Sequence, residues 1–106
     1  MSAIIVYTMV KGEDNAKKIA RCVVEERLAA ACNIVNTGIT SIYWWDGTVH
    51  EEPEVQLIMK TRRDLFKELS DRIKELHPYV VPEIISVSIE DGYPSYLKWI
   101  NDTTKH

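Results

Sequence analysis

Apolar residues fall along the chain in two rhythms, one typical of strands and the other of helices. The run from Ala3 to Val10 is rich in Ile, Val and Tyr and ends at Lys11-Gly12, which predicts a strand buried on both faces. From Glu13, apolar residues recur at steps of three and four, at Ala16, Ile19, Ala20, Val23, Val24 and Leu28. This spacing, with charged residues outside the stripe, predicts an amphipathic helix.

The middle of the chain favours two strands joined by a tight turn. Leu28 to Thr37 holds mainly small and β-branched residues, and Ile39 to Trp45 is rich in good strand formers. Asp46-Gly47 is a strong hairpin signal, because Gly tolerates the positive φ that a tight turn needs. The returning strand is expected from Thr48 to Lys60, with an edge or bulge at Pro53 because proline cannot donate to a sheet ladder.

The last third of the chain predicts a helix, a strand and a short final helix. Thr61-Arg62-Arg63-Asp64 has the spacing of a capping box, and apolar residues follow at helical spacing up to Pro78. Glu83 to Ile89 alternates between apolar and polar residues, which indicates a strand with one face more deeply buried. A final helix is expected around Tyr96 to Ile100.

This order predicts an α+β fold, the ferredoxin-like βαββαβ sandwich with a short C-terminal helix. Two helices would cover one face of a four-stranded antiparallel sheet, and a long hairpin arm would join the second and third strands. No repeat or flexible linker interrupts the 106 residues, so residues 1–106 are expected to form a single domain. The fold is widely reused and assigns no activity by itself.

Charge and composition narrow the classes of partner. Thirteen basic against sixteen acidic residues give a formal charge of -3, which argues against nucleic acid and membrane surfaces as partners. The apolar stretches are far shorter than the roughly 20 residues that span a bilayer, and the N-terminal segment lacks the pattern of a secretory signal. We therefore expect a cytoplasmic protein, in which Cys22 and Cys32 would remain thiols.

The hairpin arm carries three aromatic residues near its tip: Tyr43, Trp44 and Trp45. Strands of about 10 residues exceed the usual 5–6, so a single small sheet cannot cover the arm. The rings either fold back onto their own domain or form an oligomer interface. We favour an interface, since a symmetric oligomer in which each arm pairs with a neighbour's sheet also protects the edge strands.

The sequence resembles the CutA family of divalent-cation tolerance proteins over nearly its whole length. The segments that carry the resemblance are Glu26-Arg27-Leu28-Ala29-Ala30, Ser41 to Gly47, Glu54-Val55-Gln56, Lys60-Thr61, His77-Pro78-Tyr79, Pro82-Glu83-Ile84 and Gly92 followed by Tyr96-Leu97-Lys98-Trp99. The resemblance implies a ferredoxin-like homotrimer built through long arms, cytoplasmic in bacteria and associated with copper and other divalent metals. It also implies similarity to the trimeric nitrogen-regulatory signalling proteins, and hence an alternative role as a sensor of a small ligand or protein partner.

Two positions depart from what relatives often show. Thr8 stands where some relatives have a cysteine, and Cys32 lies one residue after the position, here Ala31, at which many carry one. A shift of one residue reverses the face of a strand, so Cys32 is a weaker candidate for copper ligation than His77.

The candidate metal ligands are His77, Cys32 and Met9. Imidazole suits Cu(II) and Zn(II), and a methionine supplies a soft thioether. Alternatively, His77 only caps the helix that ends before Pro78, and Cys22 and Cys32 are buried inert thiols. No His/Cys pair has the close spacing of a zinc site, so we expect Cu(II) or another divalent cation to bind weakly, with a trimer supplying further ligands, and no organic cofactor.

A second candidate site is a cleft between subunits formed by Lys60, Tyr79, Glu83 and Trp44. A few polar groups among aromatic rings would suit an anionic or planar ligand. The competing interpretation is an ion pair between Lys60 and Glu83 that fixes register.

Nothing in the chain predicts an enzyme. His77 and Glu83 could act as acid and base, but no nucleophile elbow, Gly-rich phosphate loop or HExxH helix is present in the sequence. The leading hypothesis is a cytoplasmic homotrimer that binds copper or other divalent cations and contributes to metal tolerance.

Overall fold

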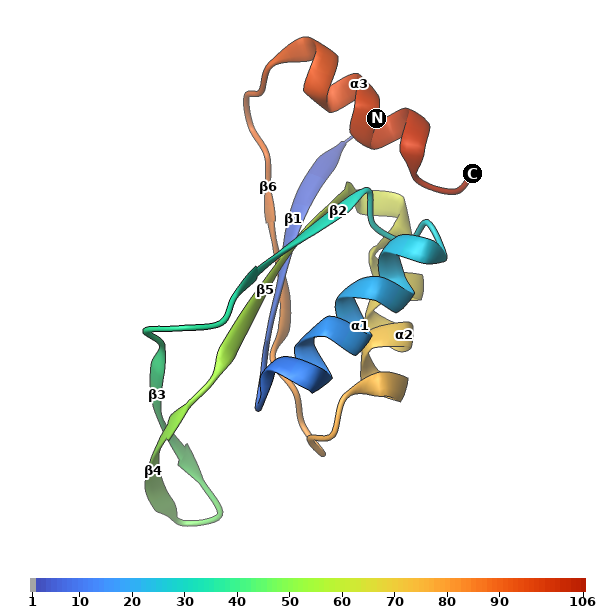
Figure 1. Cartoon of the computed structure of the whole chain (residues 1–106). Coiled ribbons are helices and arrows are strands. Elements are labelled where there is room, and N and C mark those ends of the chain that lie inside the picture. The colour runs from blue at the N-terminus through green and yellow to red at the C-terminus, as the bar shows by residue number, and fades with distance from the viewer. Residues whose placement is uncertain (1) are drawn as a thin grey trace.

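The computed structural model describes residues 2–106 and contains three α-helices, one 3-10 turn and two sheets (Figure 1). In chain order the elements are β1 (Ala3–Val10), α1 (Glu13–Glu25), β2 (Ala31–Val35), β3 (Thr40–Trp45), β4 (Thr48–Pro53), β5 (Val55–Arg62), η1 (Arg63–Leu65), α2 (Phe66–Leu76), β6 (Ile84–Ser88) and α3 (Pro94–Thr103). None of the helices in the described part of the chain is long and apolar enough to cross a membrane.

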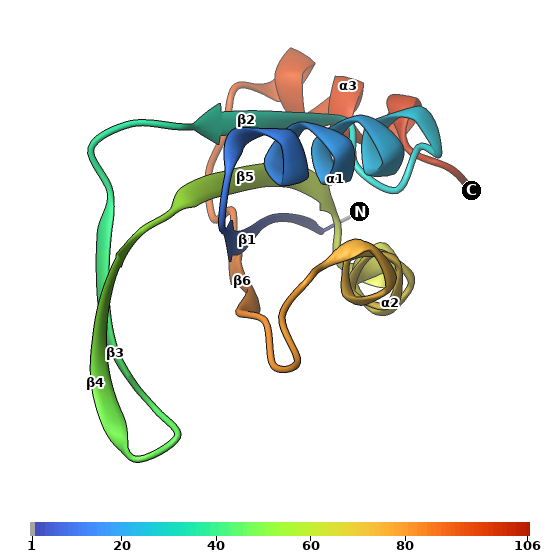
Figure 2. The ribbon, with the colours of Figure 1, turned by 60° about the horizontal axis from the view of Figure 1, so that its bottom comes forward.

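The main sheet has the strand order β2-β5-β1-β6, and all of its neighbouring strands are antiparallel. Helices α1 and α2 lie together on one face of it (Figures 1 and 2). This arrangement confirms the ferredoxin-like α+β fold. The second sheet, β3 with β4, forms the arm, which projects from the end of the body opposite α3 (Figure 1).

The core lies between the sheet and the two helices. Its fully buried side chains include Ile4, Val6, Leu57 and Met59 from the sheet, Ile19 and Val23 from α1, and Leu69 and Ile73 from α2. Burial along β1 alternates, so the expectation that this strand is buried on both faces is wrong for a single chain. Ile5, Tyr7 and Met9 point to the face that the two helices leave open and are only partly buried.

The arm turns where the sequence indicates. Asp46 and Gly47 have φ of 52° and 80°, and two central residues with positive φ make a turn whose twist suits a hairpin. The expected strand from Thr48 to Lys60 is divided, since β4 ends at Pro53 and β5 begins at Val55. At Pro53, where the sequence predicts an edge or a bulge, the structure has the end of strand β4.

The expected capping box does not form. Thr61 lies within β5, and its buried hydroxyl donates to the carbonyl of Leu28 at 2.7 Å. The turn η1 then intervenes, so α2 begins only at Phe66 and has no side-chain cap. The sequence has the spacing of a capping box, but the Thr61 hydroxyl bonds the carbonyl of Leu28 and so connects β5 to the segment after α1.

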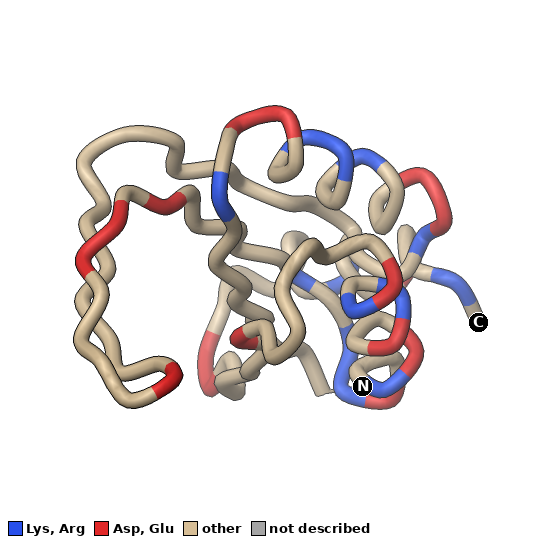
Figure 3. Tube along the Cα trace, turned by 90° about the horizontal axis from the view of Figure 1, so that it is seen from below, with Lys and Arg blue, Asp and Glu red and all other residues tan. Residues whose placement is uncertain are grey.

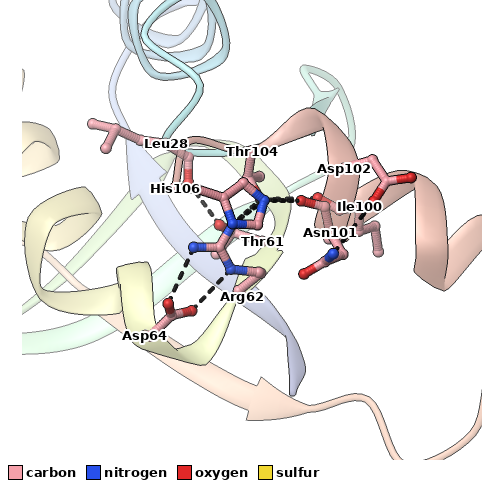
Figure 4. A network of polar contacts seen from close by, with 9 residues as sticks. All are labelled: Leu28, Thr61, Arg62, Asp64, Ile100, Asn101, Asp102, Thr104 and His106. Atoms are coloured by element: carbon pink, nitrogen blue, oxygen red, sulfur yellow. Dashed lines mark hydrogen bonds and ion pairs between the residues drawn. The ribbon is translucent and has the colours of Figure 1, made fainter. Parts of the chain in front are cut away.

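Arg62 is the centre of a polar network at the end of the body that carries α3 (Figure 4). Its side chain is buried and forms a two-bond pair with Asp64, at 3.0 and 3.1 Å. A second side of the guanidinium donates to the buried hydroxyl of Thr104 at 2.8 Å. This network fixes the residues after α3 against the end of β5, while Ile100 packs with Ala3 and Ala30.

Candidate functional site

A groove of about 690 Å³ lies between the arm and the loop that leads from α2 to β6. Its lining residues come from three parts of the chain: Met9 at the end of β1; Ser41, Ile42, Tyr43, Trp44, Trp45, Glu52 and Glu54 in and beside the arm; and Tyr79, Val80, Val81, Pro82 and Glu83 in the loop. This volume is within the range of about 300–1,000 Å³ that is usual for small-molecule sites.

The arm presents one wall of the groove through cross-strand contacts. Tyr43 pairs with His50 across the hairpin, and their rings stack with centroids 5.4 Å apart. The Tyr43 hydroxyl donates to Oε2 of Glu52 at 3.2 Å. Trp44, the next residue along the strand, pairs with Val49 and remains 74% exposed in the single chain.

His77 fixes the start of the opposite wall. It follows the last residue of α2, its ring is buried, and its Nε2 lies 2.8 Å from the carbonyl oxygen of Met9. The backbone N–H of Tyr79 donates to Nδ1 at 3.2 Å. A carbonyl accepts only from a protonated nitrogen and an N–H donates only to a free lone pair, so the ring is neutral with its proton on Nε2.

Tyr79 connects this loop to the base of the arm. Its ring packs edge-on against His77, with centroids 4.6 Å apart, and its hydroxyl donates to Oε2 of Glu54 at 2.6 Å. Burial and the hydrogen bond to Glu54 both raise the pKa of Tyr79, which keeps the phenol protonated and able to donate. The backbone N–H of Glu54 in turn donates to the carbonyl of Ile39 at 3.3 Å, which ties it to the residue just before β3.

The groove is acidic. Three of its lining residues are glutamates, Glu52, Glu54 and Glu83, and no lysine or arginine of the described residues lines it. The arm itself carries acidic segments without basic ones (Figure 3). Lining carboxylates of one sign attract ions of the opposite sign, so the groove favours cations over anions.

The structure brings together only three of the four residues expected in the cleft. Trp44, Tyr79 and Glu83 line the groove, whereas Lys60 does not. Lys60 instead donates to the side chain of Asn33 on the neighbouring strand β2. Strand β1 lies between β5, which holds Lys60, and β6, which Glu83 precedes. Within residues 2–106 of one chain, Lys60 and Glu83 therefore do not form an ion pair.

The expected metal ligands do not meet within one chain. Met9 is on the open face of the sheet and lines the groove, whereas Cys32 packs against the core on the helix-covered face. Burial raises the pKa of the Cys32 thiol to about 11, so this group is protonated at neutral pH and is a poor ligand. Both ring nitrogens of His77 are already engaged by protein groups, which leaves no lone pair for a metal. Within residues 2–106, no three His, Cys, Asp or Glu residues gather as a metal site would require.

Reasoning from the sequence missed Glu54 as a partner of Tyr79. Glu54 was part of the family resemblance and stood beside an acidic run, but no local pattern indicates a contact across 25 residues. The nearest signal in the sequence is Pro53, which interrupts strand pairing. Glu54 is the single residue between the end of β4 at Pro53 and the start of β5 at Val55.

Comparison with known proteins gives consistent results over the whole chain. The family model described as "CutA1 divalent ion tolerance protein" matches residues 4–103. The divalent-cation tolerance protein CutA of Pyrococcus horikoshii is 45% identical over 102 residues, which cover 96% of this chain and 98% of the relative. A crystal structure of CutA1 from Oryza sativa is 40% identical with a TM-score of 0.95, covering 99% of this chain and 95% of the other. The structure of the periplasmic divalent cation tolerance protein CutA from Archaeoglobus fulgidus is 34% identical with a TM-score of 0.92, covering 97% of this chain and 99% of the other.

Proposed function

The chain belongs to the CutA1 divalent ion tolerance family, and from this premise we propose that it acts as a homotrimer that binds copper or another divalent cation weakly and contributes to metal tolerance in the cytoplasm. The proposal includes no catalysis. His77 is held neutral by two protein contacts and is not free to exchange a proton with a substrate, and no catalytic activity goes with the family's name.

The main support for the proposed oligomer is the exposed apolar surface of the arm. Ile42 is 65% and Trp44 74% exposed in the single chain. Burying an aromatic or branched side chain of this kind stabilises an assembly by about 1.5–3 kcal/mol, which a second and third copy can supply. Ile85 and Val87 of β6 in the main sheet are also exposed apolar side chains.

Metal binding in this proposal uses ligands from more than one chain. Of the three candidate ligands only Met9 lines the groove, where its thioether suits copper. The groove carboxylates add oxygen donors, and a neighbouring copy would complete the set. A site shared in this way is expected to be shallow and weak, since the ligands are brought together only by assembly.

Native mass spectrometry of the purified protein, titrated with Cu(II) and separately with Zn(II), tests both parts of the proposal. We expect a trimer that takes up a fixed number of copper ions. Met9→Leu should weaken copper uptake, whereas Met59→Leu, the matched change at a fully buried core methionine, should leave it unchanged. A monomer would refute the oligomer, and scattered adducts without saturation would refute a dedicated metal site.

The groove supports a second candidate function, a trimeric sensor module that binds a small ligand or a partner, similar to the nitrogen-regulatory trimers. Its specific support is the contact chain from Met9 through His77 and Tyr79 to Glu54, which fixes the loop and the arm relative to each other. A thermal-shift screen of small metabolites tests it, because a ligand of the folded state raises the melting temperature by mass action. The absence of any stabilising compound would count against a sensor.

A further inference from the structure

The arm joins the body of the protein at a narrow junction. Residues 36–39 lead from β2 to β3, and the single residue Glu54 leads from β4 back to β5. Gly38 has a φ of 79°, a value that residues with a side chain rarely adopt. Figure 2 shows the arm turning away from the direction of β2 and β5 at this junction. The orientation of the arm relative to the body is therefore set here.

The two strands of the arm do not hold this orientation by themselves. Within residues 2–106, the hydrogen bonds of residues 40–53 all end on other residues of the arm. The backbone bond from Glu54 to Ile39 joins the two sides of the junction to each other. A two-stranded ribbon attached in this way can pivot where a few connecting residues change φ and ψ, so a contact from the body is needed to fix its angle.

Tyr79 supplies that contact. Its hydroxyl donates to Oε2 of Glu54 at 2.6 Å. Tyr79 is itself held to the body, because its backbone N–H donates to Nδ1 of His77 while Nε2 of the same ring bonds the carbonyl of Met9. A hydrogen bond to a carboxylate is stronger than one between neutral groups. The hydroxyl therefore links a fixed part of the body to the junction of the arm.

An arm held at one angle loses less freedom when copies assemble. If the arm pivots, only the fraction of chains with a competent orientation can associate, and the apparent affinity falls by that fraction. We propose that the Tyr79 hydroxyl is a brace that orients the arm for assembly, which makes Tyr79 a positioning residue of the oligomer. The brace rests on the proposed homotrimer and acts in each chain before the copies meet.

The test compares the parent protein with Tyr79→Phe, which removes only the hydroxyl. The oligomer is dissociated in urea, and its reassembly after dilution is followed by native mass spectrometry at several protein concentrations. We expect the body to refold at the parent rate, measured by circular dichroism, and the oligomer to form about three- to tenfold more slowly. Tyr93→Phe is the matched control, because Tyr93 is 75% exposed at the start of α3, far from the arm, and reassembly should be unchanged.

The rate of dissociation separates a brace from a contact between copies. It is measured by subunit exchange between isotopically labelled and unlabelled oligomers. Because a brace acts on association, dissociation of Tyr79→Phe should stay within about twofold of the parent rate, whereas the loss of an interface contact speeds dissociation.

A double-mutant cycle identifies the partner of the hydroxyl. Glu54→Ala removes the acceptor and should slow reassembly as much as Tyr79→Phe does. The double variant should be no slower than either single one, since both remove the same bond. Glu51→Ala is the control for the loss of a carboxylate on the arm, and it should leave reassembly unchanged.

The outcomes that contradict the brace are distinguishable. Reassembly at the parent rate in both Tyr79→Phe and Glu54→Ala would overturn the brace and leave the homotrimer intact. Faster dissociation with unchanged reassembly would overturn it in favour of a contact between copies, and additive losses in the double variant would show that the two residues act separately. A parent protein that stays monomeric at every concentration would overturn the proposed homotrimer, and the brace with it.

Discussion

The body and the arm of this protein use apolar residues in opposite ways. In the body, side chains such as Leu57, Met59 and Ile73 are fully buried between the sheet and two helices of the same chain. In the arm, Ile42, Trp44 and Val49 are mostly exposed, and the two strands contact only each other over most of their length. The difference shows that the body buries its apolar side chains within one chain, whereas the arm leaves them exposed there. In the proposed homotrimer, further copies would bury them.

The largest effect is expected on the stability of the body. Leu57→Ala removes a fully buried side chain from β5 and should lower the free energy of unfolding by about 2–5 kcal/mol, measured by urea denaturation. The matched truncation on the arm is Val49→Ala, at a side chain 55% exposed in the single chain. Equal losses for the two variants would contradict the division between body and arm.

The next largest effect is expected on association through the arm, with the body remaining folded. Trp44→Ala should weaken association by about 2 kcal/mol or more for each contact, since buried tryptophans dominate interfaces. The oligomer is measured by analytical ultracentrifugation over a range of concentrations. The dissociated chain should keep the circular dichroism of the folded body, and a variant that unfolds on dissociation would show that body and arm are not independent.

His77 lies where body and arm meet, and its effect should be intermediate. His77→Gln disrupts the contacts to Met9 and Tyr79 and is expected to cost about 1–3 kcal/mol of stability at neutral pH. Copper uptake should not change, because neither ring nitrogen is available to a metal. A loss of copper binding without a loss of stability would restore His77 as a ligand.

The same residue predicts a pH dependence with a definite sign. Burial lowers the pKa of His77, so the unfolded chain takes up a proton more readily than the folded one. Stability from this group is full above the unfolded pKa of about 6.5 and falls as the pH drops below it. Thermal melting from pH 7.5 to pH 5 should show this decline in the parent protein and a shallower one in His77→Gln, and parallel curves would contradict it.

The smallest effect is expected from a change at one buried hydroxyl group in the body. The Thr8 hydroxyl is fully buried and has no hydrogen-bond partner among residues 2–106. Thr8→Val replaces it by a methyl group of similar size and should raise the free energy of unfolding by about 1 kcal/mol. Thr61→Val is the control, because that hydroxyl is bonded to Leu28, and it should destabilise the body instead. A gain from both variants would show that hydrogen bonding does not decide the outcome.

The sequence predicted the fold well where local rules govern it. Asp46-Gly47 specified the turn of the arm because few residues tolerate two successive positive φ angles, and helical spacing located α1 and α2. Spacing could not predict which atoms meet across the chain. Lys60 was assigned to the cleft but pairs with Asn33, and the capping residue Thr61 is used inside the sheet, because both outcomes depend on tertiary neighbours.

The candidate site was predicted less completely for the same reason. Trp44, Tyr79 and Glu83, which the sequence predicts in a cleft between subunits, line one groove of the single chain. For His77 the sequence predicts either a metal ligand or a helix cap, and neither alternative includes its two backbone partners, which come from β1 and from the loop after α2. From the sequence alone, a histidine can be a metal ligand, a helix cap or a hydrogen-bond partner of the backbone. Only the positions of the surrounding backbone groups decide which role it takes.

The network around Arg62 bears on how the protein is made on the ribosome. Arg62 reaches its partner Asp64 almost at once, but its other buried bond is to Thr104, 42 residues later in the chain. Until that threonine leaves the exit tunnel, the side of the guanidinium that later donates to it remains without this partner. The body therefore completes its packing late in translation, after the strands and both covering helices have already been synthesised.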